Sequence, residues 1–551
     1  MSHREYWDNR MGFILAAIGS AIGLGNIWRF PYICYKHGGG AFLIPYLVAL
    51  FTTGIPLMIL EFGLGHRMAG GAPAAMGRAK RNWEWLGWFA LLVAFVITCY
   101  YAVIMGWCIN YMGYSTSLAW GDDPRAFFFT EYLGVTSGHF DLGIPRLHIV
   151  IGLVISWLAI IGAIWRGTKS VGKVVYITVL LPWLILLVFL IRSITLPGAF
   201  TGLIYYLKPN FAALADLTVW SAAYTQVFFS LSLGFGVMMA YASFLPRKCD
   251  IVNNAFIISL MDAGTAFIGG LVVFATLGYY SYSTGQPVES VVQAGPSLAF
   301  ITYPTIISMY SFLNPLIGIL FFLMLFTLGI DSAFSLVESV VTGIMDKFAT
   351  RRAPTLIAVG LAGLGIGIFF CTGAGLLWLD VVDHFMNQFG LMTVCLLEAI
   401  VIGWVIHPEE LREYINRYSE IRVGRWWNTL LRYIIPLVLT VLLLSWLGER
   451  INSSYENYSR GAEFLGGWLL VFLIPVASLF LAGLHRPAWM LAVLSAVVLS
   501  CSVYAFNHGL DFASIVMFDI AAIVLFGGAG VCIMRSRWSG AMGESAAEPP
   551  P

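Results

Sequence analysis

Two long apolar segments of this chain are each interrupted by a short run of small residues and glycine. The first run, residues 20–26, reads Ser-Ala-Ile-Gly-Leu-Gly-Asn, and the second, residues 230–236, reads Ser-Leu-Ser-Leu-Gly-Phe-Gly. Backbone that leaves a helix inside a bilayer exposes N–H and C=O groups, and each group costs several kcal/mol unless something polar fills the gap. The alternative is two helix contacts at which glycine permits close approach. Because the interruptions form a pair, we expect a substrate and ion site there.

Carboxylates inside apolar segments are the second candidate for chemistry. Asp331 lies in Leu-Gly-Ile-Asp-Ser at 328–332, and Asp262 follows the second interruption. An intramembrane charge costs at least ~2.5 kcal/mol on insertion scales, which marks such residues as functional candidates. Carboxylate, hydroxyl and freed carbonyl oxygens suit an alkali cation, so we expect both residues to bind ions. Structural roles as satisfied buried acids are expected for Glu61, Glu338, Glu398 and Asp519.

Broken helices would supply the remaining chemistry. The N-terminus of a half-helix presents free N–H groups that hold a carboxylate. Its C-terminus presents free carbonyls that hold a cation. A zwitterion and Na⁺ can therefore share one site, each neutralising the other, which gives a physical basis for coupled transport.

The composition is that of a polytopic membrane protein. The chain is 59% hydrophobic and 11% charged, with a mean hydropathy of +0.83, whereas soluble chains carry about 25% charged residues. A net charge of +1 argues against a nucleic-acid partner. The cysteines show no CxxC or metal-binding spacing and indicate apolar positions within spans; they are Cys34, Cys99, Cys108, Cys249, Cys371, Cys395, Cys501 and Cys532.

Apolar runs of about 20 residues, long enough to cross a ~30 Å hydrocarbon core, recur along the chain. The loop-sized segments 113–147 and 283–305 are expected to hold short helices that cover the site. Most Lys and Arg residues fall on one side, which predicts that both termini are cytoplasmic, with 1–10 as the N-terminus and 538–551 as a disordered tail. The predicted spans lie near 11–33, 41–64, 86–112, 148–165, 172–195, 218–245, 254–282, 306–345, 355–372, 384–406, 427–448, 464–485, 488–505 and 512–534.

Several motifs resemble those of the neurotransmitter:sodium symporter family. Gly-Ser-Ala-Ile-Gly-Leu-Gly-Asn-Ile-Trp-Arg-Phe-Pro-Tyr at 19–32, followed by Gly-Gly-Gly-Ala-Phe-Leu-Ile-Pro-Tyr at 38–46, is similar to the family's first two helices. The similarity continues at Tyr100-Tyr101, at Gln-Val-Phe-Phe-Ser-Leu-Ser-Leu-Gly (226–234) and at 328–332. It runs in order from about residue 4 to 485.

The resemblance implies an all-α, leucine-transporter-type fold. Spans 1–5 (11–195) and 6–10 (218–406) would form a 5+5 inverted repeat with helices 1 and 6 broken. Spans 11 and 12 (427–485) and two extra spans (488–534) would follow. It further implies a bacterial-type sodium-coupled amino acid transporter of the plasma membrane, in bacteria the inner membrane, and not an enzyme. The sequence does not indicate an oligomeric state.

Matching positions place the family's two Na⁺ sites on this chain. The first would use the Ala21 carbonyl, Asn26, Ser230 and Asp262 together with the substrate carboxylate. The second would use the carbonyls of Gly19, Ile22 and Leu328 with Asp331 and Ser332.

The resemblance also implies a substrate pocket between two gates. Tyr101 and the amides around Leu24 and Gly25 would hold the substrate carboxylate. Arg29 with Asp383 resembles the outer gate, closed over Tyr101 and Phe229. Arg4 with Asp346, near Trp7, resembles the inner gate, where Phe244 replaces a usual Tyr. The pocket would be lined by Ser20, Ala21, Gly23, Ile97, Tyr101, Phe229, Ser230, Ser232, Phe235, Ser332 and Leu336.

Two departures from the family pattern bear on specificity. The family's chloride site would fall at Tyr46, Gln226, Ser230, Asp262 and Ala266, but Ala266 supplies neither a hydroxyl nor a carboxylate. Many members have Asn at the position of Asp262, which shares a helix face with Ala266. We expect its charge to replace chloride, so that transport is chloride-independent. Gly23 stands where monoamine transporters carry Asp, which favours substrates that bring their own acid group.

The pocket does not single out one substrate, because a hydrophobic wall discriminates only ~1–3 kcal/mol per methylene. Taurine, GABA, proline, glycine and leucine-like amino acids all fit the expectation. An intramembrane aspartyl protease would need a GxGD sequence and a proton-sharing carboxylate pair, whereas Asp331 follows Gly-Ile. A channel is disfavoured by bulky residues expected on both sides of a central site.

Overall fold

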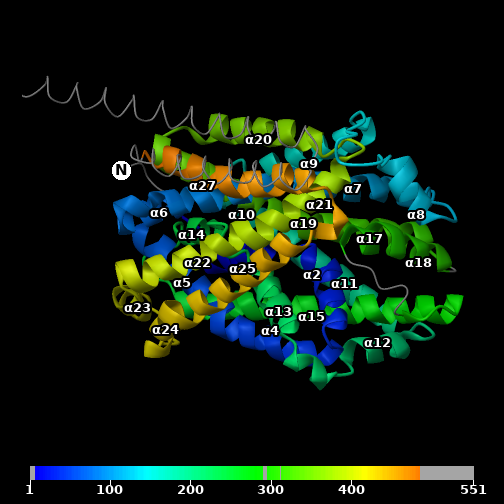
Figure 1. Ribbon diagram of the computed structural model, residues 1–551, viewed down its shortest axis with the longest axis horizontal. Helices are drawn as coiled ribbons and strands as arrows, with labels where there is room; N and C mark the ends of the chain where they lie inside the picture. The colour runs from blue at the N-terminus through cyan, green and yellow to red at the C-terminus, as the bar shows by residue number, and fades with distance from the viewer. Residues whose placement is uncertain (1–5, 289–294, 311, 484–551) are drawn as a thin grey trace, which may run out of the picture.

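The computed structural model describes residues 6–288, 295–310 and 312–483 of the 551-residue chain. Every regular element in these ranges is a helix, and the long helices lie side by side in one bundle (Figure 1). The expectation of an all-α fold is confirmed for this part of the chain. The spans predicted at 488–505 and 512–534 and the tail 538–551 lie outside the described residues.

The helices before the second interruption often follow one another without a loop. Proline in the first turn opens α3, α5 and α6, where its missing N–H costs nothing. In order they are α1 (Arg10–Ala21), α2 (Gly25–Trp28), α3 (Phe30–Lys36), η1 (Gly39–Phe42), α4 (Leu43–Ala49), η2 (Leu50–Gly54), α5 (Ile55–Met68), α6 (Ala72–Ala79), η3 (Arg81–Trp83), α7 (Glu84–Ser115), α8 (Pro124–Ala126), η4 (Phe127–Tyr132), α9 (Leu147–Ile164), α10 (Thr168–Thr178), α11 (Leu180–Ile194), α12 (Ala199–Leu207), η5 (Phe211–Ala215) and α13 (Leu217–Ser230).

The second part of the chain contains the two longest helices, α15 and α19. In order the elements are α14 (Val237–Ala242), α15 (Ile251–Thr284), α17 (Gly295–Ser297), η6 (Leu298–Thr302), α18 (Tyr303–Met309), α19 (Asn314–Phe348), α20 (Arg352–Phe369), α21 (Gly375–Phe385), η7 (Met386–Leu391), α22 (Met392–Ile400), η8 (Val401–Ile406), α23 (Pro408–Asn416), α24 (Arg425–Thr429), η9 (Leu430–Ile434), α25 (Ile435–Asn452), η10 (Tyr455–Asn457), α26 (Arg460–Glu463), η11 (Phe464–Trp468) and α27 (Leu469–Leu481).

The described ranges hold ten helical runs that are long and apolar enough to cross a membrane, and α1 with α2–α3 forms an eleventh span bent by 49°. Each predicted span up to residue 485 overlaps such a run or a broken pair of helices. Two predicted starts are wrong. The span expected from 306 begins at Asn314, because Leu313 has a positive φ and Pro315 opens α19. The span expected from 384 begins at Gly375.

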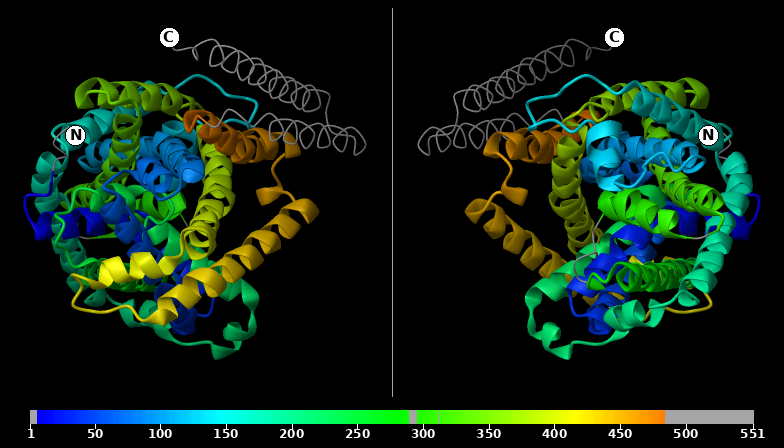
Figure 2. Two further views of the ribbon diagram at one scale, coloured as in Figure 1. Left: turned by 90° about the vertical axis from the view of Figure 1, so that its left-hand side faces the viewer. Right: turned by 90° about the vertical axis from the view of Figure 1, so that its right-hand side faces the viewer.

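Burial separates the central helices from the peripheral ones. In the most apolar window of Arg81–Ser115, which contains α7, 83% of residues are buried, against 28% in Thr168–Ile194 and in Arg425–Asn457. The helix α7 packs along α19 through the centre of the bundle. Figure 2 shows the gold helix α25 on the outside. Because lipid tails are as apolar as a protein core, the peripheral helices can expose leucine and isoleucine.

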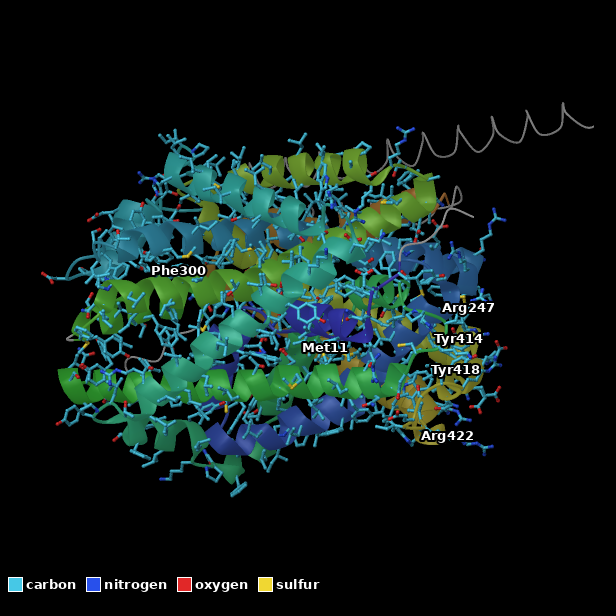
Figure 3. The ribbon with its side chains drawn as sticks, turned by 180° about the vertical axis from the view of Figure 1, so that it is seen from behind. Met11, Arg247, Phe300, Tyr414, Tyr418 and Arg422 are labelled. Atoms are coloured by element: carbon cyan, nitrogen blue, oxygen red, sulfur yellow. The ribbon has the colours of Figure 1, made fainter. Side chains whose placement is uncertain are left out.

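Segments that are expected on the same side of the membrane lie at the same end of the bundle. Figure 3 shows Arg247 and Arg422 near Tyr414 and Tyr418 at one end, and Phe300 toward the other. The first four come from segments expected on the cytoplasmic side, whereas Phe300 comes from a segment expected outside. The orientation itself stays a prediction.

The backbones of α7 and α9 approach each other at a pair of glycines. A Cβ on Gly106 would lie 2.7 Å from the carbonyl carbon of Gly152, and a Cβ on Gly152 would lie 2.7 Å from the carbonyl oxygen of Gly106. Small residues of this kind let membrane helices pack closely. Any side chain at either position must push the helices apart.

We therefore expect Gly152→Ala to lower the melting temperature of the purified protein, since overpacking costs about 1–3 kcal/mol. Gly162→Ala is the matched control on the same helix, because no neighbouring heavy atom lies within 4 Å of its Cβ position. A thermal unfolding scan in detergent compares the two variants. Equal melting temperatures would contradict the close approach.

Candidate functional site

The first interruption ends α1 at Ala21, and the helix restarts at Gly25. Ile22 has an extended backbone with φ −78° and ψ 105°. The side-chain oxygen of Asn26 accepts a hydrogen bond of 3.1 Å from the N–H of Gly23. The predicted break is therefore confirmed, and a nearby side chain partners one of the backbone groups that it frees.

The second interruption separates α13, which ends at Ser230, from α14, which begins at Val237. Between them Ser232, Gly234 and Gly236 have positive φ angles of 52°, 76° and 70°, a conformation that glycine adopts readily. The carboxylate of Glu61, on α5, accepts the N–H of Gly234 at 2.8 Å. This predicted break is also confirmed.

The two breaks meet at the carbonyl oxygen of Ser20. The Ser232 hydroxyl donates to this oxygen at 2.8 Å, and the hydroxyl of Ser332, on α19, donates to it at 3.2 Å. The Ser20 hydroxyl lies 2.8 Å from that of Ser335. The carbonyl belongs to the last turn of α1, where helical partners are missing. It thus joins α1, the second break and α19.

The buried carboxylate of Asp262, on α15, contacts residues from both broken helices. Asn26 donates from Nδ2 to Asp262 Oδ1 at 2.8 Å. The Ser230 hydroxyl donates to the two carboxylate oxygens at 2.9 and 2.7 Å. No Lys or Arg pairs with Asp262 within the described ranges. The charge has polar partners there but no opposite charge.

A second buried carboxylate, Asp331 of α19, lies against α1. A Cβ on Gly19 would lie only 2.7 Å from Asp331 Oδ2, so this approach depends on glycine. Thr178 of α10 donates from Oγ1 to Asp331 Oδ1 at 2.6 Å. In the part of the chain that the structure describes, Asp331 also has no Lys or Arg partner.

Thr178 is a site residue that the sequence reasoning missed. A single threonine in an apolar run has no periodicity or charge that marks it. The available signal is Pro182, four residues later, because proline lacks the N–H that would bond to the Thr178 carbonyl. α10 accordingly ends at Thr178, and α11 begins at Leu180.

The predicted pocket residues surround the first break. The hydroxyl of Tyr101 lies 3.5 Å from the backbone N of Leu24. A Cβ on Gly23 would lie 3.0 Å from Ser332 Oγ and 3.3 Å from the Tyr101 hydroxyl, and one on Gly25 would lie 2.8 Å from the Phe229 ring. Further predicted site residues are buried: Ala21, Ile22, Ile97, Phe235, Leu328 and Leu336.

The predicted outer gate differs from the observed arrangement. Arg29 and Asp383 form no ion pair among the described residues. The Arg29 guanidinium instead lies 4.8 Å from the centre of the Phe229 ring. Asp383 accepts the Tyr100 hydroxyl at 2.6 Å and the Asn387 amide at 2.9 Å. Arg29 and Asp383 stay within electrostatic reach of each other, but their direct contacts are with a ring face and with neutral donors.

The predicted inner gate is described only in part. Trp7 donates from its indole nitrogen to the Tyr241 carbonyl at 2.9 Å and from its backbone to the Phe244 carbonyl at 3.1 Å. The backbone of Phe244 therefore takes part although its side chain lacks a hydroxyl. Asp346 accepts the N–H of Gly71 at 2.8 Å. Its predicted partner Arg4 lies outside the described residues.

The carboxylates expected to have structural roles have different surroundings. Glu338 forms an ion pair with Arg352, and Glu61 accepts the Gly234 N–H. Glu398 is buried, and neither of its oxygens has a hydrogen-bond partner in the described ranges. Asp519 lies outside those ranges.

The residues at the family's chloride position provide buried polar groups. The Tyr46 hydroxyl and the Gln226 amide have no hydrogen-bond partner among the described residues. They come from α4 and α13, which pack together. Ala266, on α15 like Asp262, is fully buried.

Comparison with known proteins identifies the family to which this sequence is similar. The model of the sodium:neurotransmitter symporter family matches residues 4–123 and 120–505. An uncharacterized sodium-dependent transporter of Methanocaldococcus jannaschii is 43% identical over 481 residues, which cover 86% of this chain and 97% of that protein.

Two animal proteins are also similar over most of their length. The sodium-dependent dopamine transporter of Caenorhabditis elegans is 33% identical over 540 residues, covering 88% of this chain and 87% of the relative. The human sodium- and chloride-dependent GABA transporter 2 is 33% identical over 529 residues, covering 87% of this chain and 86% of the relative. The protein with the two broken helices therefore belongs to the sodium:neurotransmitter symporter family of sodium-dependent membrane transporters.

Proposed function

We propose that this protein is a sodium-coupled symporter of amino acids or related amino compounds that carry a carboxylate or sulfonate. The observation that carries the proposal is a pair of helix breaks joined at Ser20, with Asp262 and Asp331 buried beside them. Neither carboxylate has a cationic side-chain partner in the described ranges. Such a charge is costly to bury alone, and a bound cation would offset that cost.

Two Na⁺ ions would bind, one at each carboxylate. The first would use the Ala21 carbonyl, Asn26, Ser230 and Asp262 with the substrate's acid group. The second would use the carbonyls of Gly19, Ile22 and Leu328 with Asp331 and Ser332. The oxygen-only donor sets fit a hard alkali cation. Within the described residues no group of three or more His, Cys, Asp or Glu side chains could hold a metal ion.

The substrate's acid group would lie at the first break. Tyr101 and the free amides near Leu24 would hold it, because amides at a helix N-terminus favour an anion. Gly23 offers no side-chain carboxylate, so a substrate without an acid group would leave the first Na⁺ shell incomplete. Binding of ion and substrate would then depend on each other.

Small β- or γ-amino acids such as taurine and GABA form the second candidate substrate class. The human relative named as a GABA transporter favours them. A remote alternative is a channel or an intramembrane enzyme. Contacts of Arg29 with Phe229 on one side and of Trp7 with Tyr241 on the other favour alternating access. The protein would reside in the plasma membrane with both termini cytoplasmic.

Na⁺ should raise the melting temperature of the purified protein, and K⁺ should not, because a ligand that binds the folded state stabilises it. Asp331→Asn should abolish the part of this shift that arises from the second site. Thr178→Val should weaken Na⁺ binding about 10- to 100-fold, since a lost hydrogen bond to a charged group costs about 1.5–3 kcal/mol.

The matched control for Thr178 is Thr53→Val, because the buried Thr53 hydroxyl donates at 2.5 Å only to the Ala49 carbonyl. Uptake into proteoliposomes provides the functional readout. Equal uptake of amino acids when K⁺ replaces Na⁺ in the gradient would refute the proposed coupling.

Uptake should be equal in chloride and in gluconate, because Asp262 supplies the negative charge near the first Na⁺. Asp262→Asn should lose most uptake in gluconate and regain part of it in chloride. The measurement is initial uptake rate in the two media. A wild-type rate that collapses in gluconate would contradict chloride independence.

Amino acids should raise the melting temperature in Na⁺ far more than their decarboxylated amines do. The panel should include α-, β- and γ-amino acids and taurine. Gly23→Asp should remove this response, because even its Cβ would lie 3.0 Å from Ser332 Oγ and 3.3 Å from the Tyr101 hydroxyl. Gly23→Ala separates the effect of size from that of charge. An amine without an acid group that binds as well as the amino acids would contradict the assignment.

A further inference from the structure

A cavity separate from the two breaks opens between α11, α15, α18 and α19. It encloses about 310 Å³, near the lower end of the range of roughly 300–1,000 Å³ for small-molecule sites. Its floor consists of buried apolar and aromatic side chains, among them Val272, Tyr303, Ile307 and Phe321. The rings of Tyr303 and Phe321 stack with centres 4.1 Å apart. None of the residues that line it belongs to the proposed substrate or ion sites.

The rim of this cavity continues the lipid-facing surface of the bundle. Val188, Phe312 and Leu316 line it, and each is about half exposed or more. Exposed apolar side chains on a membrane helix face lipid, so an acyl chain can enter the cavity from the bilayer without crossing water. The rim therefore indicates an occupant that dissolves in the membrane.

Arg192 supplies the only charge among the cavity-lining residues in the described ranges. It lies in the last turn of α11, with its guanidinium 5.4 Å from the centre of the Tyr310 ring. The guanidinium donates one hydrogen bond among the described residues, a long one of 3.5 Å to the Thr195 hydroxyl. No carboxylate there forms an ion pair with it. The cavity thus combines an apolar interior with a cation at its mouth that has no carboxylate partner among the described residues.

We propose that this cavity binds a fatty acid, with one acyl chain in the apolar interior and the carboxylate on Arg192. A guanidinium binds a carboxylate through two parallel hydrogen bonds. The small volume favours a single chain over the two chains of a phospholipid. The occupant would contact α11 and α19 together.

Binding of this kind should also slow transport. α19 carries Asp331 and Ser332 as well as part of the cavity wall. An occupant that ties α11 to α19 would restrain their relative movement. This effect on uptake rests on the proposed function, whereas the binding itself does not.

The test is photolabelling of the full-length protein in phosphatidylcholine nanodiscs with a diazirine-bearing palmitate. Labels should concentrate on peptides that contain 180–194 and 303–321. Oleate should compete at least tenfold more strongly than oleyl alcohol, which lacks the carboxylate. Equal competition by the alcohol, or labels spread evenly over the lipid-facing helices, would overturn the proposal.

Substitutions test which residues of the cavity bind the fatty acid. Arg192→Gln should weaken competition by oleate at least tenfold, and Arg192→Lys should retain most of it. Arg125→Gln is the matched control, because Arg125 also lies over a ring, 5.4 Å from the centre of Phe129, but does not line the cavity. Leu316→Trp, which fills the cavity from its exposed rim, should abolish the labelling while the melting temperature stays at the wild-type value. Labelling that persists in both Arg192→Gln and Leu316→Trp would refute the site.

Two further measurements distinguish a fatty acid from a phospholipid, and binding in the cavity from the proposed transport function. Phosphatidylglycerol that competes more strongly than oleate would overturn the fatty-acid assignment in favour of an anionic phospholipid. Oleate should lower the initial uptake rate of wild type and leave that of Leu316→Trp unchanged. Labelling that follows these expectations in a protein without Na⁺-dependent uptake would refute only the proposed transport function.

Discussion

The need to provide partners for backbone groups inside a bilayer governs this structure. Asn26 accepts the N–H of Gly23, and Glu61 accepts that of Gly234. The Ser20 carbonyl accepts hydroxyls from Ser232 and from α19. Side chains thus partner backbone groups that the helix breaks leave free, and the bonds to Ser20 and Gly234 connect the breaks to other parts of the molecule.

The same arrangement concentrates charge where few neighbours neutralise it. Asp262 is bonded by an amide and a hydroxyl, and Asp331 by the hydroxyl of Thr178. Neutral donors orient a carboxylate but leave its charge in place. Under the proposed function, a cation would complement these carboxylates, and the acid group of a solute would lie at the backbone amides of the first break.

The sequence predicted the breaks because two such glycine and serine runs occur as a pair, whereas a single glycine-rich run can form a continuous helix, as it does in α20. It also placed Asp262 close to Asn26 and Ser230 through a family resemblance. The contact of Thr178 with Asp331 could not be predicted, since it depends on how α10 packs against α19. The placement of Arg29 over Phe229 was missed for a similar reason, because competition between a carboxylate and a ring face is decided by tertiary geometry. The start of α19 was misplaced because hydropathy alone does not register the turn at Leu313.

The attachment of Trp7 to α14 has a mechanical consequence. Two hydrogen bonds and an edge-to-face ring contact with Tyr241 attach the chain just before α1 to α14 and the residues that follow it. α1 and α14 are thereby connected at two places, through Trp7 and through the hydrogen bond of Ser232 to Ser20. A movement of one of these helices is therefore transmitted to the other, and the contacts of Trp7 are among those that must break before the two can separate.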